Sequence, residues 1–373
     1  MSCPSLRDTS HSYANQYLDE VASLVLQRCR MIEVLWREKF ESAGMLTDAQ
    51  NCAMESILHI IENCLRGKLV RPALCYLGYL AVDVGEPCEK SYDYAVMNGA
   101  ALELFHLSAL IQDDVMDASN MRRGILSLRA FVYSELKNNT TVTDDSLIQR
   151  AADGVATVVG DSLITEAWYL VAQLPSRCSD EWRSMMAAVH AGQTLDLYCS
   201  VLENVVEGDS GTTVALKTGA YSIHFPTRLG AIIAGANSRE LSVLAKFCRH
   251  VSTAFCLRDD YLDIWGDPEM TGKPTLLDVR DGKKTSVYWR AEEILSGDDL
   301  LLLRKVVCDG SVGDSEIAEL INILSRSGVG RRLEKEIREE YEQACVALRS
   351  DAIRPYARCQ LQRQAHELSF RSR

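Results

Sequence analysis

The stretch 101-ALELFHLSALIQDDVMD-117 predicts a buried helix that ends in a cluster of acids. Its first part is mostly apolar, with the three- and four-residue spacing of a helix inside a protein. Asp113, Asp114 and Asp117 then follow at positions i, i+1 and i+4. Positions i and i+4 of a helix differ by about 40° in direction and about 6 Å in height, so Asp113 and Asp117 share one face.

The same spacing returns in 255-FCLRDDYLDIWGD-267, where Asp259, Asp260 and Asp263 follow another apolar run. One Asp-rich helix end is often only solvated, but two with identical spacing favour a shared function. Carboxylates that face each other across a partly dry cavity repel and need cations. Mg²⁺ prefers oxygen ligands and uses a few carboxylates together with substrate phosphates. We therefore predict Mg²⁺ at both clusters, holding a polyphosphate. The spacing does not fit a calcium-binding EF-hand loop.

Basic residues stand beside both acid clusters. Arginine forks suit phosphate oxygens, and helix N-termini attract anions. The candidates are Lys68 and Arg71 in 67-GKLVRP-72, Arg122 and Arg123, Lys217 with Thr218, Lys273, and Lys283 in 282-GKKT-285. His106 lies seven residues before Asp113 and shares its face, which leaves both a ligand contact and an ordinary core histidine open.

The composition narrows the class of protein. The 373 residues carry a net charge of −12, which argues against nucleic acid as a partner because a phosphate backbone needs a broad basic surface. Thirteen cysteines without a C-x-x-C motif indicate free thiols in a reducing compartment. The chain has no apolar signal core and no uncharged apolar run of membrane-spanning length, so we predict a cytoplasmic protein without a transmembrane span.

Helical periodicity dominates and alternating patterns are nearly absent, which predicts an all-α fold with few or no strands. We expect one domain over 1–373, with 1–12 and 355–373 as possible flexible ends; the basic tail from 354 favours a solvated or frayed terminus. Breaks are expected at 84–87, 137–145, 206–213 and in a long, functional loop at 266–285. The helices are expected near 14–42, 48–65, 88–117, 145–174, 180–205, 213–236, 239–265, 285–296, 314–326 and 330–350.

Several motifs in order make the chain similar to the trans-isoprenyl diphosphate synthases, over roughly residues 60–290. The sequence around the motifs most resembles that of short-chain geranylgeranyl and farnesyl diphosphate synthases of actinobacteria. The matching segments are 67-GKLVRP-72, 103-ELFHLSALIQDDVMD-117, 122-RRG-124, 192-GQTLD-196, 217-KT-218, 259-DDYLD-263, 272-GK-273 and 282-GKKT-285.

The resemblance implies the isoprenoid synthase fold, a bundle of long helices around a deep central cavity, usually as a homodimer. It implies that Asp113, Asp117 and Asp259 bind three Mg²⁺, with Mn²⁺ as a substitute, and that Asp114, Asp260 and Asp263 support them. The resemblance also implies that Arg122, Lys217, Thr218 and Lys273 bind the allylic diphosphate, and that Lys68, Arg71, His106 and Arg123 bind isopentenyl diphosphate. Lys283 is a further predicted substrate-binding residue.

The implied reaction breaks the allylic C–O bond and joins the resulting cation head-to-tail to isopentenyl diphosphate. Two positions depart from the family pattern: Cys256 replaces a glutamine, and Leu276 replaces a glycine. Both put the strength or selectivity of allylic binding in doubt. Neither removes a metal ligand.

Small side chains at Ser108 and Ala109, with Phe105 about 12 Å deeper than Asp113, suggest a cavity floor at Phe105. This predicts a C20 product, geranylgeranyl diphosphate, with C15 farnesyl diphosphate as the competitor; Phe105 as core filler fits equally well. Two other functions compete. A class I terpene cyclase usually lacks a second D-D-x-x-D and needs no isopentenyl site. A non-catalytic partner subunit or lipid-binding protein should have lost acids from one cluster, and here none is lost.

Overall fold

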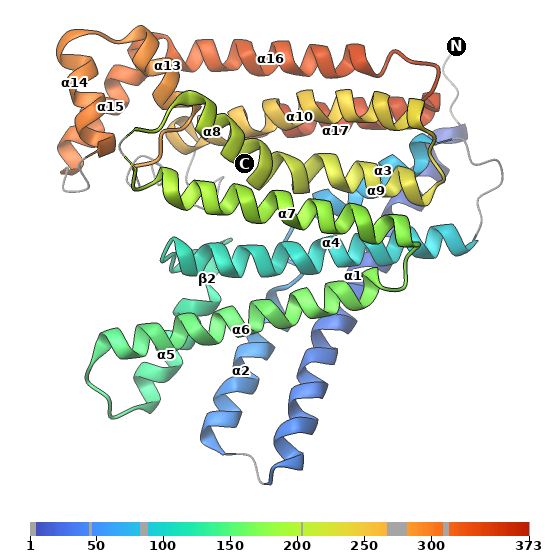
Figure 1. Ribbon diagram of the computed structural model, residues 1–373, viewed down its shortest axis with the longest axis vertical. Helices are drawn as coiled ribbons and strands as arrows, with labels where there is room; N and C mark the ends of the chain where they lie inside the picture. The colour runs from blue at the N-terminus through green and yellow to red at the C-terminus, as the bar shows by residue number, and fades with distance from the viewer. Residues whose placement is uncertain are drawn as a thin grey trace. The chain divides into compact units, whose positions relative to one another are not determined.

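The computed structural model describes residues 5–44, 47–82, 89–202, 204–266, 282–308 and 313–372. The predicted all-α class is confirmed, because helices form nearly all of this part of the chain (Figure 1). Within it, only β1 (Met121–Arg122) and β2 (Ile125–Leu126) are strands, and they pair as one hairpin. The chain divides into two compact units, Met1–Tyr76 with Gly85–Ser179, and Leu77–Val84 with Asp180–Arg373. The expectation of a single domain stays a prediction.

The first unit is built around α4, whose residues from Ala100 to Ser108 are all buried. α4 packs against α6 and α1, and α5 packs against α6. α4 passes a length and hydropathy test for a membrane span, but 78% of its apolar window is buried, as in the core helix of a globular fold. The helices of this unit are α1 (Ser5–Ser42), α2 (Asp48–Asn63), the first part of α3 (Val70–Ala81), α4 (Glu89–Met116), α5 (Leu128–Asn139) and α6 (Asp145–Val171).

Helix α5 is an element that periodicity alone does not predict. Its buried side chains are Leu128, Ala130 and Val132, a two-residue spacing that does not match a helical stripe. Its start is defined locally, because the Ser127 hydroxyl accepts a hydrogen bond from the Ala130 amide. Packing against α6 then stabilises a helix that its sequence pattern signals only weakly.

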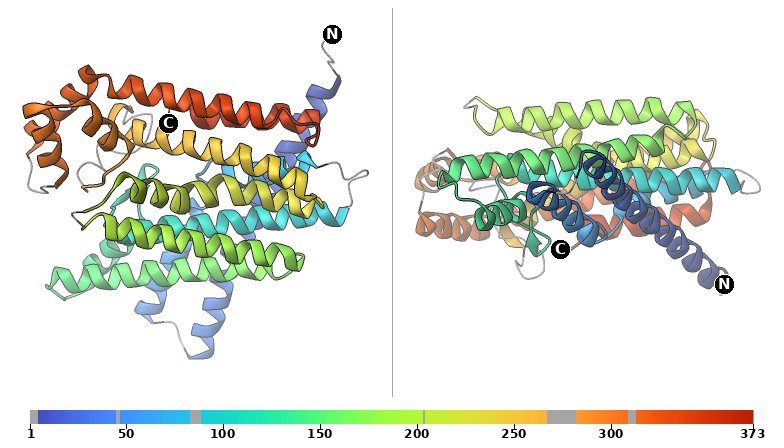
Figure 2. Two further views of the ribbon diagram at one scale, coloured as in Figure 1. Left: turned by 45° about the horizontal axis from the view of Figure 1, so that its top comes forward. Right: turned by 90° about the horizontal axis from the view of Figure 1, so that it is seen from below.

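The second unit is a layered set of helices in which α10 runs along α16 and both contact α17 (Figure 2). The apolar cluster that joins α10, α13, α14, α15 and α16 includes Ile264, Ala291, Leu303 and Leu333. The elements are most of α7 (Ser176–Cys199), then α8 (Glu207–Val214), η1 (Ala215–His224), α9 (Phe225–Ile233), α10 (Ser238–Trp265), α13 (Ser286–Ile294), α14 (Gly297–Cys308), α15 (Asp314–Ser327), α16 (Val329–Ala347) and α17 (Pro355–Ser369).

Three regions of the second unit differ from the sequence expectation. The expected break at 206–213 forms α8, and α14 was not anticipated. The basic C-terminal stretch, expected as a solvated end, forms α17 with a buried face that includes Ala357, Leu361 and Ala365. These side chains recur every four residues, but frequent Arg and Gln between them obscure the apolar stripe. Residues 267–281, which carry most of the expected functional loop, lie outside the described residues.

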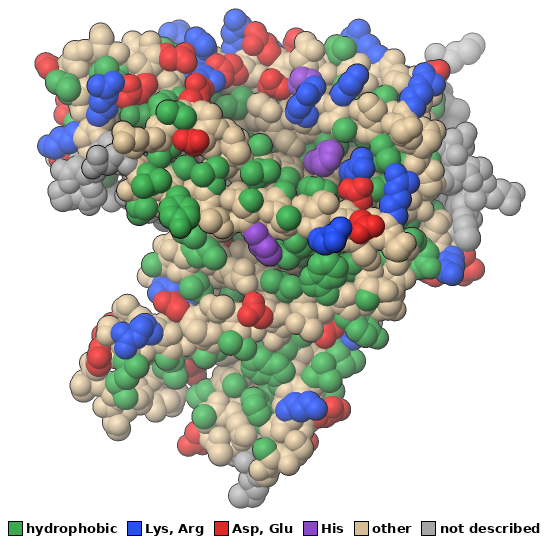
Figure 3. All heavy atoms as spheres, viewed as in Figure 1, with side chains coloured by type: hydrophobic (Ala, Val, Ile, Leu, Met, Phe, Trp, Pro, Cys, Tyr) green, Lys and Arg blue, Asp and Glu red, His purple; other side chains and the backbone are tan. Residues whose placement is uncertain are grey.

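The expected thiol chemistry and surface charge agree with the described part of the chain. The ten cysteines whose side chains are described carry free thiols. On the face drawn in Figure 3, the described Lys and Arg side chains are mixed with Asp and Glu. This face therefore shows no broad basic area among its described residues.

Candidate active site

The first aspartate cluster lies at the C-terminal end of α4 and is held by Arg122. Nε of Arg122 donates to Oδ1 of the buried Asp114 at 2.8 Å, and Nη2 of Arg122 also contacts this oxygen. The same Nη2 lies 3.6 Å from Oδ2 of Asp113. Burial lowers the pKa of Arg122, but bonding to Asp114 and the charges of Asp113 and Asp117 outweigh it, so the pKa is raised overall. Asp114 thus supports the cluster, while Asp113 stays partly exposed.

The β1–β2 hairpin sends two neighbouring arginines to different partners. Arg123 and Gly124 form its turn, with φ values of 53° and 79°. Positive φ at both central residues is the geometry of a two-residue type I′ turn. From this turn, Arg122 reaches the aspartate cluster, and Nη2 of Arg123 lies 3.2 Å from Nε2 of His106. The expectation of few or no strands is confirmed, and the one hairpin among the described residues positions site residues.

A buried charge cluster lies deeper along α4, around Glu103 and His106. Burial raises the pKa of Glu103, and the charges of Arg71 and Arg123 oppose that shift. Burial, then the charges of Arg71, Arg123 and Arg122, lowers the pKa of His106 well below its usual value. Because a guanidinium only donates, Nε2 of His106 accepts from Arg123 and the ring is neutral. His106 therefore orients an arginine and adds no positive charge.

Gly67, the first residue of 67-GKLVRP-72, allows the loop before α3 to lie against Arg123. A Cβ at Gly67 would stand 3.0 Å from Nη1 of Arg123, closer than side chains usually tolerate. Lys68 and Arg71 follow directly, and Arg71 is near enough to Glu103 and His106 to shift both pKa values. The structure thus brings together Arg71, His106 and Arg123, the predicted isopentenyl diphosphate residues, with Lys68 beside them in sequence.

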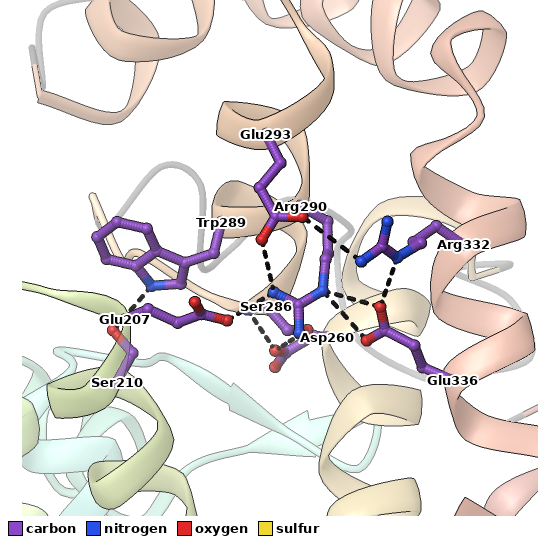
Figure 4. Close-up of polar contacts among 9 residues, drawn as sticks. All are labelled: Glu207, Ser210, Asp260, Ser286, Trp289, Arg290, Glu293, Arg332 and Glu336. Atoms are coloured by element: carbon purple, nitrogen blue, oxygen red, sulfur yellow. Dashed lines mark hydrogen bonds and ion pairs between the residues drawn. The ribbon is translucent and has the colours of Figure 1, made fainter. Parts of the chain in front are cut away.

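The second aspartate cluster lies near the C-terminal end of α10. Oδ2 of Asp260 accepts hydrogen bonds from the amide of Ser286 at 2.8 Å and from its hydroxyl at 2.6 Å (Figure 4). Asp260 therefore fixes the first turn of α13, which suits the supporting role that the resemblance implies. Asp259 is half exposed and forms an ion pair with Arg371, near the end of the chain. Burial, with the charges of Asp259 and Asp260, raises the pKa of the Cys256 thiol, so this departure from the family pattern is an inert buried group.

Arg290 ties α13 to the neighbouring helices beside Asp260 (Figure 4). Nε of Arg290 lies 2.9 Å from Glu336 on α16, and Nη1 lies 2.5 Å from Glu207 on α8. Trp289 adds a hydrogen bond of 3.2 Å to Ser210 of α8. The helix that follows 282-GKKT-285 is therefore held by contacts to both α8 and α16, and these contacts keep Ser286 against Asp260.

Lys217 lies in η1, whose wide π-helical turns often mark functional sites. Its Nζ forms an ion pair of 2.6 Å with Asp196, the last residue of 192-GQTLD-196. Gly192 makes this pairing possible, because a Cβ there would meet the amide nitrogen of Lys217 at 2.4 Å. The glycine and the aspartate of this motif thus both act on Lys217, the first by allowing close approach and the second by holding its charge.

Replacing Gly192 by alanine should push η1 away from α7. We expect Gly192→Ala to lower the free energy of unfolding by about 1–3 kcal/mol, the usual cost of overpacking, and to lower activity because Lys217 moves. Gly211→Ala is the matched control, since a Cβ at Gly211 of α8 meets no atom within 4 Å. Urea unfolding and product formation measure both effects. Equal stability of the two variants would contradict the proposed close approach.

Some predicted site residues lie outside the described residues, and some residues of the site were not predicted from the sequence. Lys273 and Leu276 lie outside the described residues. Thr218 lies in η1, and Lys283 lies three residues before the start of α13. Asp196, Glu103 and Arg371 were assigned no role: the first two stand in recognised motifs, and Arg371 carries no local sequence signal.

The donor set fits a hard divalent cation. Each cluster supplies carboxylate oxygens on a shared helical face, and Asp113 and Asp259 are partly solvent-exposed. In each cluster a guanidinium already balances an acid, which shows that the carboxylates attract cations. Among the described residues, no group of three or more His, Cys, Asp or Glu is arranged as a complete metal site. The two clusters belong to different units, so a cavity shared between them stays a prediction.

The fold and these clusters define a class, the all-α isoprenoid synthases. The sequence pattern of the family described as polyprenyl synthetase matches residues 54–324. A short chain isoprenyl diphosphate synthase of Methanothermobacter thermautotrophicus is 30% identical over 276 residues, covering 74% of this chain and 78% of that protein. A (2E,6E)-farnesyl diphosphate synthase of Mycobacterium tuberculosis is 27% identical, covering 82% and 79%.

Among solved structures, geranylgeranyl pyrophosphate synthase from Corynebacterium glutamicum, complexed with isoprenyl diphosphate and magnesium, superposes with a TM-score of 0.81. It is 27% identical and covers 95% of this chain and 99% of its own. The chain belongs to the polyprenyl synthetase family. It is a trans-prenyltransferase, and the predicted fold and enzyme class are confirmed.

Proposed function

We propose that the protein is a Mg²⁺-dependent, cytoplasmic enzyme that condenses isopentenyl diphosphate with dimethylallyl, geranyl or farnesyl diphosphate. This proposal rests on the arrangement of charged side chains near the C-terminal end of α4. There Arg122 faces the aspartate cluster, while Arg71 and Arg123 form a separate, half-buried basic cluster around the buried and neutral His106. One hairpin thus links a metal-binding face to an anion-binding face, as a two-diphosphate reaction requires.

In this proposal Asp113 and Asp117 hold metal in the first unit and Asp259 holds metal in the second. When bound, Mg²⁺ stabilises the negative charge that develops on the leaving diphosphate. Arg122 and Lys217 add hydrogen bonds to that diphosphate, and Asp114 and Asp196 orient these cations. Arg71 and Arg123 hold the diphosphate of isopentenyl diphosphate, with Glu103 and His106 fixing their side chains. Apolar residues of α4 exclude water from the allylic cation.

The direct test is incubation with Mg²⁺, radiolabelled isopentenyl diphosphate and each allylic primer in turn, followed by chromatography of the lipid products. Label in a prenyl product of defined length would support the proposal. Label found only in unreacted isopentenyl diphosphate would instead favour a binding protein or a non-catalytic partner subunit.

We propose geranylgeranyl diphosphate as the main product, with farnesyl diphosphate as the alternative. Phe105 is only 3% exposed and lies about two helical turns before Asp113 on α4, which supports a floor below the aspartate cluster. Ser108 lies toward α6, since a Cβ at Gly160 would stand 3.4 Å from its hydroxyl. If Phe105 is the floor, Phe105→Ala should shift the product to longer chains by one or more C5 units. An unchanged product length would assign Phe105 to the core alone.

We also propose a homodimer that uses the exposed side of α6. Leu147, Val158 and Tyr169 are 46%, 53% and 57% exposed, and their spacing places them on one face of the helix. Such a face suits a second copy of the chain. Light scattering should give twice the 41.5 kDa of one chain, and Val158→Lys should give the monomer mass. A monomeric wild-type protein would exclude this proposal.

A further inference from the structure

The chain end returns to the second aspartate cluster and is fixed there by several contacts. Nε of Arg258 donates to the main-chain carbonyl of Arg371 at 2.8 Å. The Phe370 ring lies 5.4 Å from the Tyr341 ring and 4.9 Å from the His366 ring. These contacts anchor both the backbone and the preceding side chain. The position of Arg371 is therefore built into the fold of the second unit.

The Arg371 side chain connects this anchor to a predicted metal ligand. Its guanidinium lies 4.2 Å from the centre of the Phe255 ring, one turn before Asp259. It then forms an ion pair with Oδ1 of Asp259. The Arg371 side chain is 20% exposed and that of Asp259 is 51% exposed, so a mostly covered cation caps a more accessible acid. Stacking on an aromatic face limits the rotamers of the arginine and favours this pairing.

We propose that Arg371 is a resident counter-charge that competes with divalent cations for Asp259. A Mg²⁺ ion needs a carboxylate oxygen at about 2.0–2.1 Å, and the guanidinium occupies Oδ1 of that carboxylate. The two cations also repel each other. Metal binding through Oδ1 of Asp259 therefore requires Arg371 to turn away, while the contacts of Arg258 and Phe370 keep Arg371 nearby. This inference rests on the proposed function and adds a control on when the second cluster accepts metal.

The test is a titration of the full-length protein with Mn²⁺ alone, followed by the electron paramagnetic resonance signal of free Mn²⁺. Arg371→Ala should bind Mn²⁺ about two- to fivefold more tightly, the range expected for losing one partly exposed ion pair. Arg371→Gln keeps a long planar side chain over Phe255 and should show the same gain. Arg363→Ala is the matched control, because Arg363 is an exposed arginine of α17 whose ion pair among the described residues is with Glu367.

A double-mutant comparison locates the effect. In an Asp259→Asn background, Arg371→Ala should leave Mn²⁺ affinity nearly unchanged, since the carboxylate that pairs with Arg371 is already gone. If wild-type protein shows Asp259-dependent binding that Arg371→Ala does not strengthen, the competition is excluded and the proposed function stands. A gain in Arg371→Ala but not in Arg371→Gln, or an equal gain in Arg363→Ala, would also exclude it. If no variant shows Asp259-dependent binding, the metal role of the second cluster fails as well.

Discussion

Asp113→Ala should lower the turnover number about 10³-fold or more while the protein stays folded, because several kcal/mol of charge stabilisation at the leaving diphosphate are lost. Asp113 lies on the accessible side of the first cluster, and Arg122 keeps its hydrogen bonds to Asp114 without it. The damage should therefore fall on metal binding rather than on packing. Product formation at saturating Mg²⁺ and both substrates measures the change.

The matched control is Asp93→Ala, which removes an exposed acid from the same helix. It carries the same change in charge and helix propensity but lies five turns from the cluster. It should keep near-normal turnover. If Asp113→Ala kept more than about a tenth of the activity, Asp113 would not be the metal ligand that its spacing predicts.

Local spacing predicted the parts of the site that lie within one helix. The acids at i, i+1 and i+4 share a face because helical geometry fixes their directions, and α4 and α10 both form as expected. The structure also separates the two roles within the first cluster, since Asp114 is buried against Arg122 while Asp113 is partly exposed. Spacing alone could not distinguish the two roles. Whether Asp113 or Asp114 is buried depends on where Arg122 lies in the folded chain, and the spacing of the acids does not encode this.

Contacts between distant segments were beyond the sequence argument. Arg371 and Asp259 are 112 residues apart, and nothing near Arg371 signals an aspartate partner. The pairing of Lys217 with Asp196 is similar, because it depends on the close approach of η1 to Gly192. The motif 192-GQTLD-196 pointed to this region, but its contact with Lys217 is seen only in the folded structure, where α7 and η1 lie together.

The hairpin around Arg123 shows a second limit of periodicity. A strand of two residues is too short to show an alternating pattern, so periodicity does not predict this hairpin or its turn with positive φ. The R-R-G sequence could have signalled it, since a glycine after a turn residue is common in type I′ hairpins. This geometry explains why Arg122 contacts the aspartate cluster while the adjacent Arg123 contacts His106.

Arg123→Ala should raise the Michaelis constant for isopentenyl diphosphate about 100-fold, the loss of a charge-assisted hydrogen bond worth roughly 2–3 kcal/mol. The turnover number should change only a few-fold, because Arg122 and the aspartates remain. Arg123 lies against Gly67 and His106, inside the half-buried basic cluster, so its loss removes a positive charge from the proposed anion site. Alanine keeps the Cβ, so the strain of the turn is unchanged. Steady-state kinetics with isopentenyl diphosphate varied measure the effect.

Two further variants separate anion binding from general effects of charge. Arg123→Lys keeps the charge but loses the planar fork, so it should recover only part of the affinity. Arg129→Ala removes an arginine of α5 that pairs with Asp153 at 2.7 Å and donates to Ala118 and Asn120 just before the hairpin, so it tests whether loosening the hairpin alone raises the Michaelis constant. It should lower stability and leave the Michaelis constant near normal. An equal rise in Arg123→Ala and Arg129→Ala would indicate a global effect, and a fall in turnover alone would move Arg123 from substrate binding to the chemical step.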